Sequence, residues 1–176
     1  EFALLDAYFR RFGEGEVRLI RLRDRAEAAQ RFTIRRGDWS ALRRALESTP
    51  ADGGTDLGAF VAEGGAGEYL LFSDGLENLG DGRFPDLGAP VHAVSASVRN
   101  DAGRLRHIAR HSGGRFIDLM AHTGVEAAHA LLGELPRLHD LAGEGVSVLV
   151  AASPFPVNGR LQVAGVLDAP QGRLKL

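Results

Sequence analysis

Apolar residues recur with a helical period in several stretches of the chain. Phe2, Leu5, Phe9 and Phe12 follow one another at steps of three, four and three, so they form one face of a helix over 2–12. Similar spacings predict a helix that begins at Asp38 or Ser40, a short one over 57–63, one around 105–109 and a last one over 125–135.

Short apolar runs separate these helices. Tyr69-Leu70-Leu71-Phe72 is continuous, which is typical of a parallel strand covered on both faces. Further strands are expected over 17–22, up to residue 34, over 91–98 and over 116–120, and the Gly- and Pro-rich stretch 76–90 is expected to be a surface loop. The alternation indicates an α/β fold with three layers, a mostly parallel sheet and helices on both faces.

The pattern changes after Pro136. Residues 146–152, 161–167 and 173–176 are strand-like and lack a helical period. We therefore expect an α/β domain over 1–136 and the start of a β-rich segment over 137–176. The chain opens at Glu1-Phe2 inside an expected helix, so we interpret it as a piece of a longer protein.

The amino-acid composition argues against several classes of binding partner. The chain has 176 residues with 21 Lys+Arg against 23 Asp+Glu, so it has no basic surplus for gripping phosphates, and we expect no nucleic-acid partner. No apolar run approaches the roughly 20 residues of a membrane helix, so no membrane insertion by this chain is expected. The chain has 0 Cys, which excludes Cys-ligated metals and thiol nucleophiles.

Two motifs follow apolar segments: Gly53-Gly54-Thr55-Asp56-Leu57, and Ser73-Asp74-Gly75 directly after the run at 69–72. Their order and separation, with the helices and strands before them, resemble the von Willebrand factor A domain over residues 1–136. The stretch from Ser153-Pro154-Phe155-Pro156 onward is similar to the β segment that follows this domain in proteins related to inter-alpha-trypsin inhibitor heavy chains.

The resemblance implies a metal-assisted adhesion site at the carboxyl edge of the sheet. Thr55 and Asp74 would be its metal ligands, and Ser73, Asp56 and Glu77 would form its binding rim. Mg²⁺ takes six oxygen ligands, and an acidic group of a protein partner would complete the shell. The family's first strand, with its Asp-x-Ser-x-Ser motif, is missing here. We therefore expect no cofactor in this chain, and Mg²⁺ only in the intact parent.

Local structural roles are the alternatives for these residues. Thr55 or Asp56 suits the N-cap of the helix at 57–63, and Ser73-Asp74-Gly75 suits a strand-to-loop turn. His107 and His111 have a spacing that can chelate a transition metal, but arginines surround them. We interpret that pair as part of a solvated helix face.

No nucleophile elbow, phosphate-binding loop or metalloprotease helix is present, and we do not expect an enzyme. The expected function is a protein-interaction domain that docks its ligand at the carboxyl edge of the sheet. One alternative is a metal-independent scaffold that packs on a neighbouring β domain. A less favoured alternative is a small α/β hydrolase or phosphoryl-transfer domain that uses Asp74.

The missing first strand leaves a slot in the expected sheet, between the strands at 17–22 and 69–73. Unpaired backbone groups there cost about 1–3 kcal/mol each. Residues 146–152 are apolar enough for a two-sided environment, so we expect them to fill the slot. They would come from the same chain or from a second copy, which would give a strand-swapped homodimer.

Overall fold

The computed structural model describes residues 1–22, 25–49, 56–61, 64–76, 82–133, 138, 140–152, 156 and 160–175. The helical segments are α1 (Phe2–Phe12), α2 (Ser40–Glu47), the single 3₁₀ turn η1 (Leu57–Ala59), α3 (Ala102–Ser112) and α4 (Gly124–Leu132). The strands of the first part are β1 (Gly15–Leu19), β2 (Gln30–Ile34), β3 (Tyr69–Phe72), β4 (Val91–Ser95) and β5 (Phe116–Asp118). The strands of the last part are β6 (Ala142–Glu144), β7 (Val146–Ala151), β8 (Val163–Leu167) and β9 (Arg173–Lys175).

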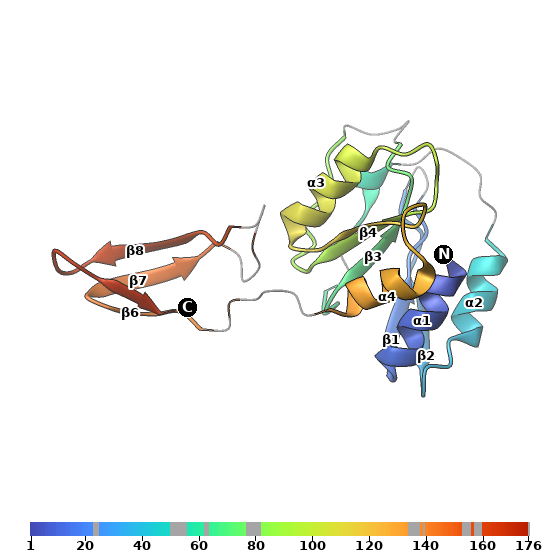
Figure 1. The fold of residues 1–176 in the computed structure, drawn as a ribbon, viewed down its shortest axis with the longest axis horizontal. Coiled ribbons are helices and arrows are strands. Elements are labelled where there is room, and N and C mark those ends of the chain that lie inside the picture. Colours follow the sequence, from blue (N-terminus) through green and yellow to red (C-terminus); the bar gives the residue numbers. More distant parts are fainter. Residues whose placement is uncertain are drawn as a thin grey trace.

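The α/β class predicted from the sequence is confirmed, with a smaller parallel sheet than expected (Figure 1). β3, β4 and β5 form a parallel sheet in that order, whereas β1 and β2 form a separate antiparallel pair. β1 begins two positions earlier than predicted, because Gly15 pairs with Ile34 and the ladder runs back to that point.

Alternate side chains of β3 enter two different apolar clusters. Leu70 and Phe72 join the main core, which contains Phe9 of α1 and Leu131 of α4. Leu71 packs against clusters that include residues of α3 instead. Side chains on both faces of β3 pack against apolar clusters, and this explains why the run at 69–72 is continuously apolar.

Side chains at the starts of α3 and α4 satisfy backbone donors there. The Asp101 carboxylate accepts a hydrogen bond from the Arg104 N–H at 2.9 Å. Thr123 and Glu126 form a reciprocal capping box at the start of α4. These caps fix the residues at which α3 begins after β4 and α4 begins after β5.

The last four strands form two antiparallel pairs, β6 with β9 and β7 with β8 (Figure 1). Val146 faces Leu167 and Ala151 faces Val163, so the prediction that 146–152 fills the slot within its own chain is wrong. Consecutive strands usually pair with each other, and β8 satisfies backbone groups of β7 that the slot would otherwise have to satisfy. The strand-swapped homodimer involves a second chain and stays a prediction.

Candidate functional site

Ser73 and Asp74 form a tight turn at the carboxyl end of β3. The Ser73 Oγ accepts a hydrogen bond from the Gly75 N–H, and Asp74 Oδ1 accepts one from the Leu76 N–H, both at 3.0 Å. The Asp74 carbonyl accepts a further bond from the Asp101 N–H at 2.8 Å, which joins the turn to the start of α3. The side chains therefore serve the turn itself, in agreement with the structural alternative.

Gly75 explains why this turn carries the Ser-Asp-Gly sequence. Its φ is 73°, a left-handed conformation that glycine adopts without steric cost. A Cβ at this position would lie 2.9 Å from Leu105 Cγ and 3.0 Å from the Asp101 carbonyl oxygen. The motif is therefore required by the close approach of the turn to α3.

Asp56 also has a local role. Its Oδ1 accepts a hydrogen bond from the Gly58 N–H at 2.8 Å, and Asp56 is the N-cap of η1. Thr55 and Glu77, the other expected ligand and rim residue, lie outside the described residues. Within the described part, no three His, Asp or Glu side chains gather as a metal site would require. The donors of the described residues do not fit a magnesium site.

His107 and His111 lie on the exposed side of α3. Their rings stack at a centroid distance of 5.7 Å, and both side chains are solvent-exposed. With no third ligand from the described chain beside them, the pair fits the predicted solvated helix face.

A cleft of about 780 Å³ is lined by β1 from one side and by β3 from another. Apolar side chains of α1 and α2 complete its wall, with Phe9, Phe12 and Leu46 among them. Its size lies within the range of ligand-binding pockets. The cleft occupies the region between the two strands that the sequence predicted would border an empty slot.

One backbone edge of β3 faces away from the rest of its sheet. The N–H groups of Tyr69 and Ser73 donate to Pro90 and Val94 at 2.8 and 3.1 Å, so these alternate positions bond to β4. Leu70 and Phe72 fall between them and turn their backbone groups the other way. In the described chain no strand pairs with that side of β3, and β1 pairs only with β2. Two strand edges that no other described strand pairs with therefore border one cleft.

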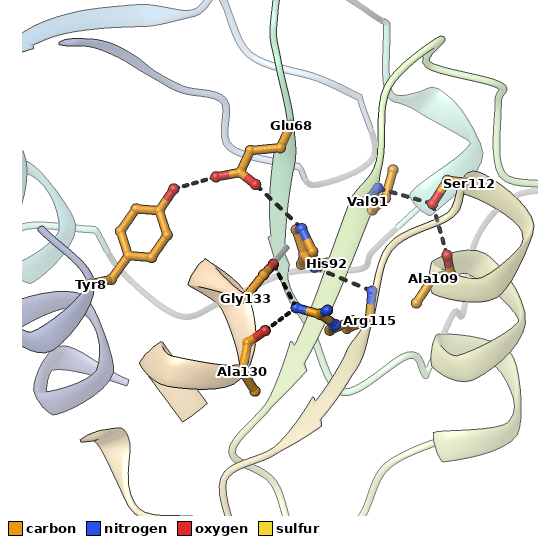
Figure 2. A network of polar contacts seen from close by, with 9 residues as sticks. All are labelled: Tyr8, Glu68, Val91, His92, Ala109, Ser112, Arg115, Ala130 and Gly133. Carbon is orange, nitrogen blue, oxygen red and sulfur yellow. Dashed lines mark hydrogen bonds and ion pairs between the residues drawn. The ribbon is translucent and has the colours of Figure 1, made fainter. Parts of the chain in front are cut away.

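A polar cluster lies at the start of β3 (Figure 2). The Tyr8 hydroxyl of α1 donates a hydrogen bond to Oε1 of Glu68, and Oε2 of Glu68 lies 3.3 Å from Nε2 of His92. His92 in β4 is fully buried, and its Nδ1 accepts a hydrogen bond from the Arg115 N–H at 3.2 Å. Tyr8 and Glu68 both line the cleft.

The electrostatics of this cluster keep Tyr8 protonated and Glu68 charged. Burial raises the pKa of Tyr8, and its hydrogen bond to Glu68 raises it further. The contact with His92 lowers the pKa of Glu68 and the Tyr8 hydrogen bond adds to this effect, whereas burial acts in the opposite direction. Glu68 is therefore a carboxylate at neutral pH.

The sequence interpretation missed this cluster. A usable signal was present, because His92 interrupts an apolar strand and Glu68 stands directly before another. A polar residue inside a buried strand needs a partner from elsewhere in the fold. Which segment supplies that partner cannot be deduced from spacing along the chain.

Comparisons with known proteins identify no relative of this chain. No family model, no curated protein and no solved structure matches the chain. None of the described helices is long and apolar enough to cross a membrane.

Proposed function

We propose that this chain is a protein-interaction domain, not a catalyst, and that it takes up an extended segment of a partner as a strand between β1 and β3. One observation carries the proposal: two strand edges without a partner in the described chain border the same apolar cleft of about 780 Å³. An unpaired strand edge is a ready template for another chain.

The addition of a strand would use both the unpaired strand edges and the apolar wall of the cleft. Main-chain hydrogen bonds to the exposed groups of Leu70 and Phe72 would supply affinity, and pockets for alternate side chains would supply selectivity. Because Phe9 and Phe12 contribute to the wall, the ligand's inward side chains should be apolar. This mode needs no metal ion.

The resemblance to the von Willebrand A domain supports a related version of the proposal. In that version the domain is a three-layer A-type scaffold, and the intact parent docks its ligand at the carboxyl edge of the sheet with Mg²⁺. Asp74 lies at that edge, but one of its oxygens is engaged by the Leu76 N–H. The cleft therefore has the stronger physical support.

A metal-independent scaffold that packs on a neighbouring β domain is the second candidate, and the last strands favour it. Val148, Val150 and Leu167 are 72%, 58% and 64% exposed in the β7–β8 pair. A two-stranded sheet with an exposed apolar surface is marginally stable until another layer covers it.

Amide hydrogen exchange with a strand-forming peptide tests the main proposal. The probe is a soluble nine-residue peptide of alternating Val and Thr, titrated into the whole chain. We expect saturable binding and slower exchange at Leu70 and Phe72, whose N–H groups face the cleft. If exchange at both positions is unchanged at saturating peptide, docking between β1 and β3 is wrong.

The chain offers a matched pair of variants for this test. Gly67 lines the cleft and Gly64 does not, while a Cβ at either position meets nothing within 4 Å. Gly67→Trp should fill the cleft and weaken peptide binding about tenfold or more, equivalent to ~1.4 kcal/mol. Gly64→Trp should bind as the wild type does. Equal effects of the two substitutions would contradict the location of the site.

A further inference from the structure

Glu68 is the acidic group of the cleft that pairs with no Lys or Arg of the described chain. Its side chain is 35% exposed and lines the cleft directly before β3. Glu16, the other acid of the lining, has Arg18 at 2.9 Å. Among the described residues Glu68 contacts Tyr8 and His92 and has no Lys or Arg partner.

Neither neighbour of Glu68 is a Lys or Arg side chain. His92 Nδ1 accepts a hydrogen bond from the Arg115 N–H, so the ring presents Nε2 to Glu68. That Nε2 is fully buried and lies 3.3 Å from the carboxylate, yet it is not aligned for a hydrogen bond. Tyr8 contributes a neutral hydroxyl. The cluster therefore orients the carboxylate without a Lys or Arg of the described chain.

A carboxylate that stays charged beside apolar walls attracts a cation that enters the recess. The attraction between opposite charges is stronger next to a low-dielectric wall than in bulk water. The half-exposed position of Glu68 leaves room for a group that enters from the cleft. A Lys or Arg side chain meets this requirement with a charge-assisted hydrogen bond.

We propose that the extended segment docked between β1 and β3 carries a Lys or Arg that pairs with Glu68. The inference rests on the proposed function and names the chemistry of its ligand: alternating apolar residues with one basic residue near the start of β3. Charge complementarity selects this partner over a neutral or acidic strand. Glu68 is then the residue that determines specificity.

Three peptides that differ at one position test this inference. One Val of the alternating Val/Thr peptide, on the face that packs against α1 as Glu68, Leu70 and Phe72 do, is replaced by Lys, Gln or Glu, and binding to the whole chain is measured by calorimetry. We expect the Lys peptide to bind about tenfold more tightly than the Gln peptide, as for a hydrogen bond to a charged group. The Glu peptide should bind most weakly. Added salt should reduce the preference for Lys.

Variants of the protein test whether Glu68 causes the preference for the Lys peptide. In Glu68→Gln the Lys and Gln peptides should bind with equal affinity, because the amide keeps the shape and removes the charge. Glu16→Gln is the matched control, since Glu16 lines the same cleft but is paired with Arg18, and it should keep the preference. Amide exchange at Leu70 and Phe72 verifies that each variant is folded and binds in the cleft.

The outcomes separate this inference from the proposed function. Saturable binding of all three peptides with equal affinity overturns the role of Glu68 and leaves strand docking intact. A preference for Lys that persists in Glu68→Gln overturns it as well. If none of the three peptides binds, the proposed function fails and this inference fails with it.

Discussion

The Tyr8 hydroxyl donates a hydrogen bond to the Glu68 carboxylate, and this contact joins α1 to the start of β3 across 60 positions of the chain (Figure 2). Both residues line the cleft, so one hydrogen bond fastens its helical wall to its strand edge. The buried hydroxyl and the carboxylate satisfy each other where water has limited access. The contact therefore contributes to stability and to the shape of the candidate site.

Tyr8→Phe should destabilise the chain, because it removes the hydroxyl and leaves the Glu68 oxygen without its donor. We expect a loss of about 1–3 kcal/mol in the free energy of unfolding, measured by urea denaturation. A double-mutant cycle with Glu68→Gln isolates the pair. Strictly additive single effects would mean that the two groups do not interact in solution.

Glu68 should make stability depend on pH in the acid range. Its pKa in the folded state lies below the ordinary value of 4.5, so the folded chain holds the proton less tightly than the unfolded chain. The stabilisation is present above that ordinary value and is lost as pH falls through the folded-state pKa. Denaturation midpoints measured from pH 7 to pH 3 should fall less steeply for Glu68→Gln than for the wild type.

Glu126 is the control for this pH experiment. Hydrogen bonds with the backbone and side chain of Thr123 lower its pKa as well, and it belongs to the capping box of α4 and does not line the cleft. Glu126→Gln should leave the Glu68 contribution in place. Identical pH profiles for Glu68→Gln and the wild type would contradict the assignment.

Gly75→Ala should be more destabilising than Gly82→Ala. Both glycines have positive φ, 73° and 79°, so both substitutions carry the same conformational strain. A Cβ at residue 75 would also lie 2.9 Å from Leu105 Cγ, whereas one at residue 82 meets nothing within 4 Å. Thermal unfolding should show a difference of about 1–3 kcal/mol, the usual cost of overpacking. Equal losses would mean that the turn is not packed against α3.

Magnesium should bind this chain weakly or not at all. The carboxylate of Asp74 is engaged by the Leu76 N–H, and one carboxylate with a hydroxyl leaves the ion mostly hydrated. Calorimetry with Mg²⁺ or Mn²⁺ should give no saturable heat at micromolar concentrations. Micromolar binding that disappears in Asp74→Ala would refute this prediction and restore the metal site at the sheet edge.

Local features of this protein could be predicted from the sequence. The helical spacing from Phe2 to Phe12 and the apolar run at 69–72 reappear as α1 and β3 with the predicted bounds. The turn at Ser73-Asp74-Gly75 also follows from residue type, because side chain and backbone bond within a few positions. These features depend on short-range contacts, which the order of residues specifies directly.

The candidate site depended on the tertiary structure. Tyr8, Glu68 and His92 come from three separate segments, and no spacing rule brings a helix residue to a carboxylate 60 positions away. The partner of β7 also depended on the tertiary structure, because its apolar residues suit either the predicted slot or β8, and they pair with β8. The sequence by itself determined most of the helices, strands and turns, because periodicity and turn chemistry are local, but the helix expected over 57–63 is a 3₁₀ turn at Leu57–Ala59. The tertiary structure alone decided that β1 and β3 border one cleft beside the Glu68 carboxylate, because this arrangement depends on contacts between residues distant in the chain.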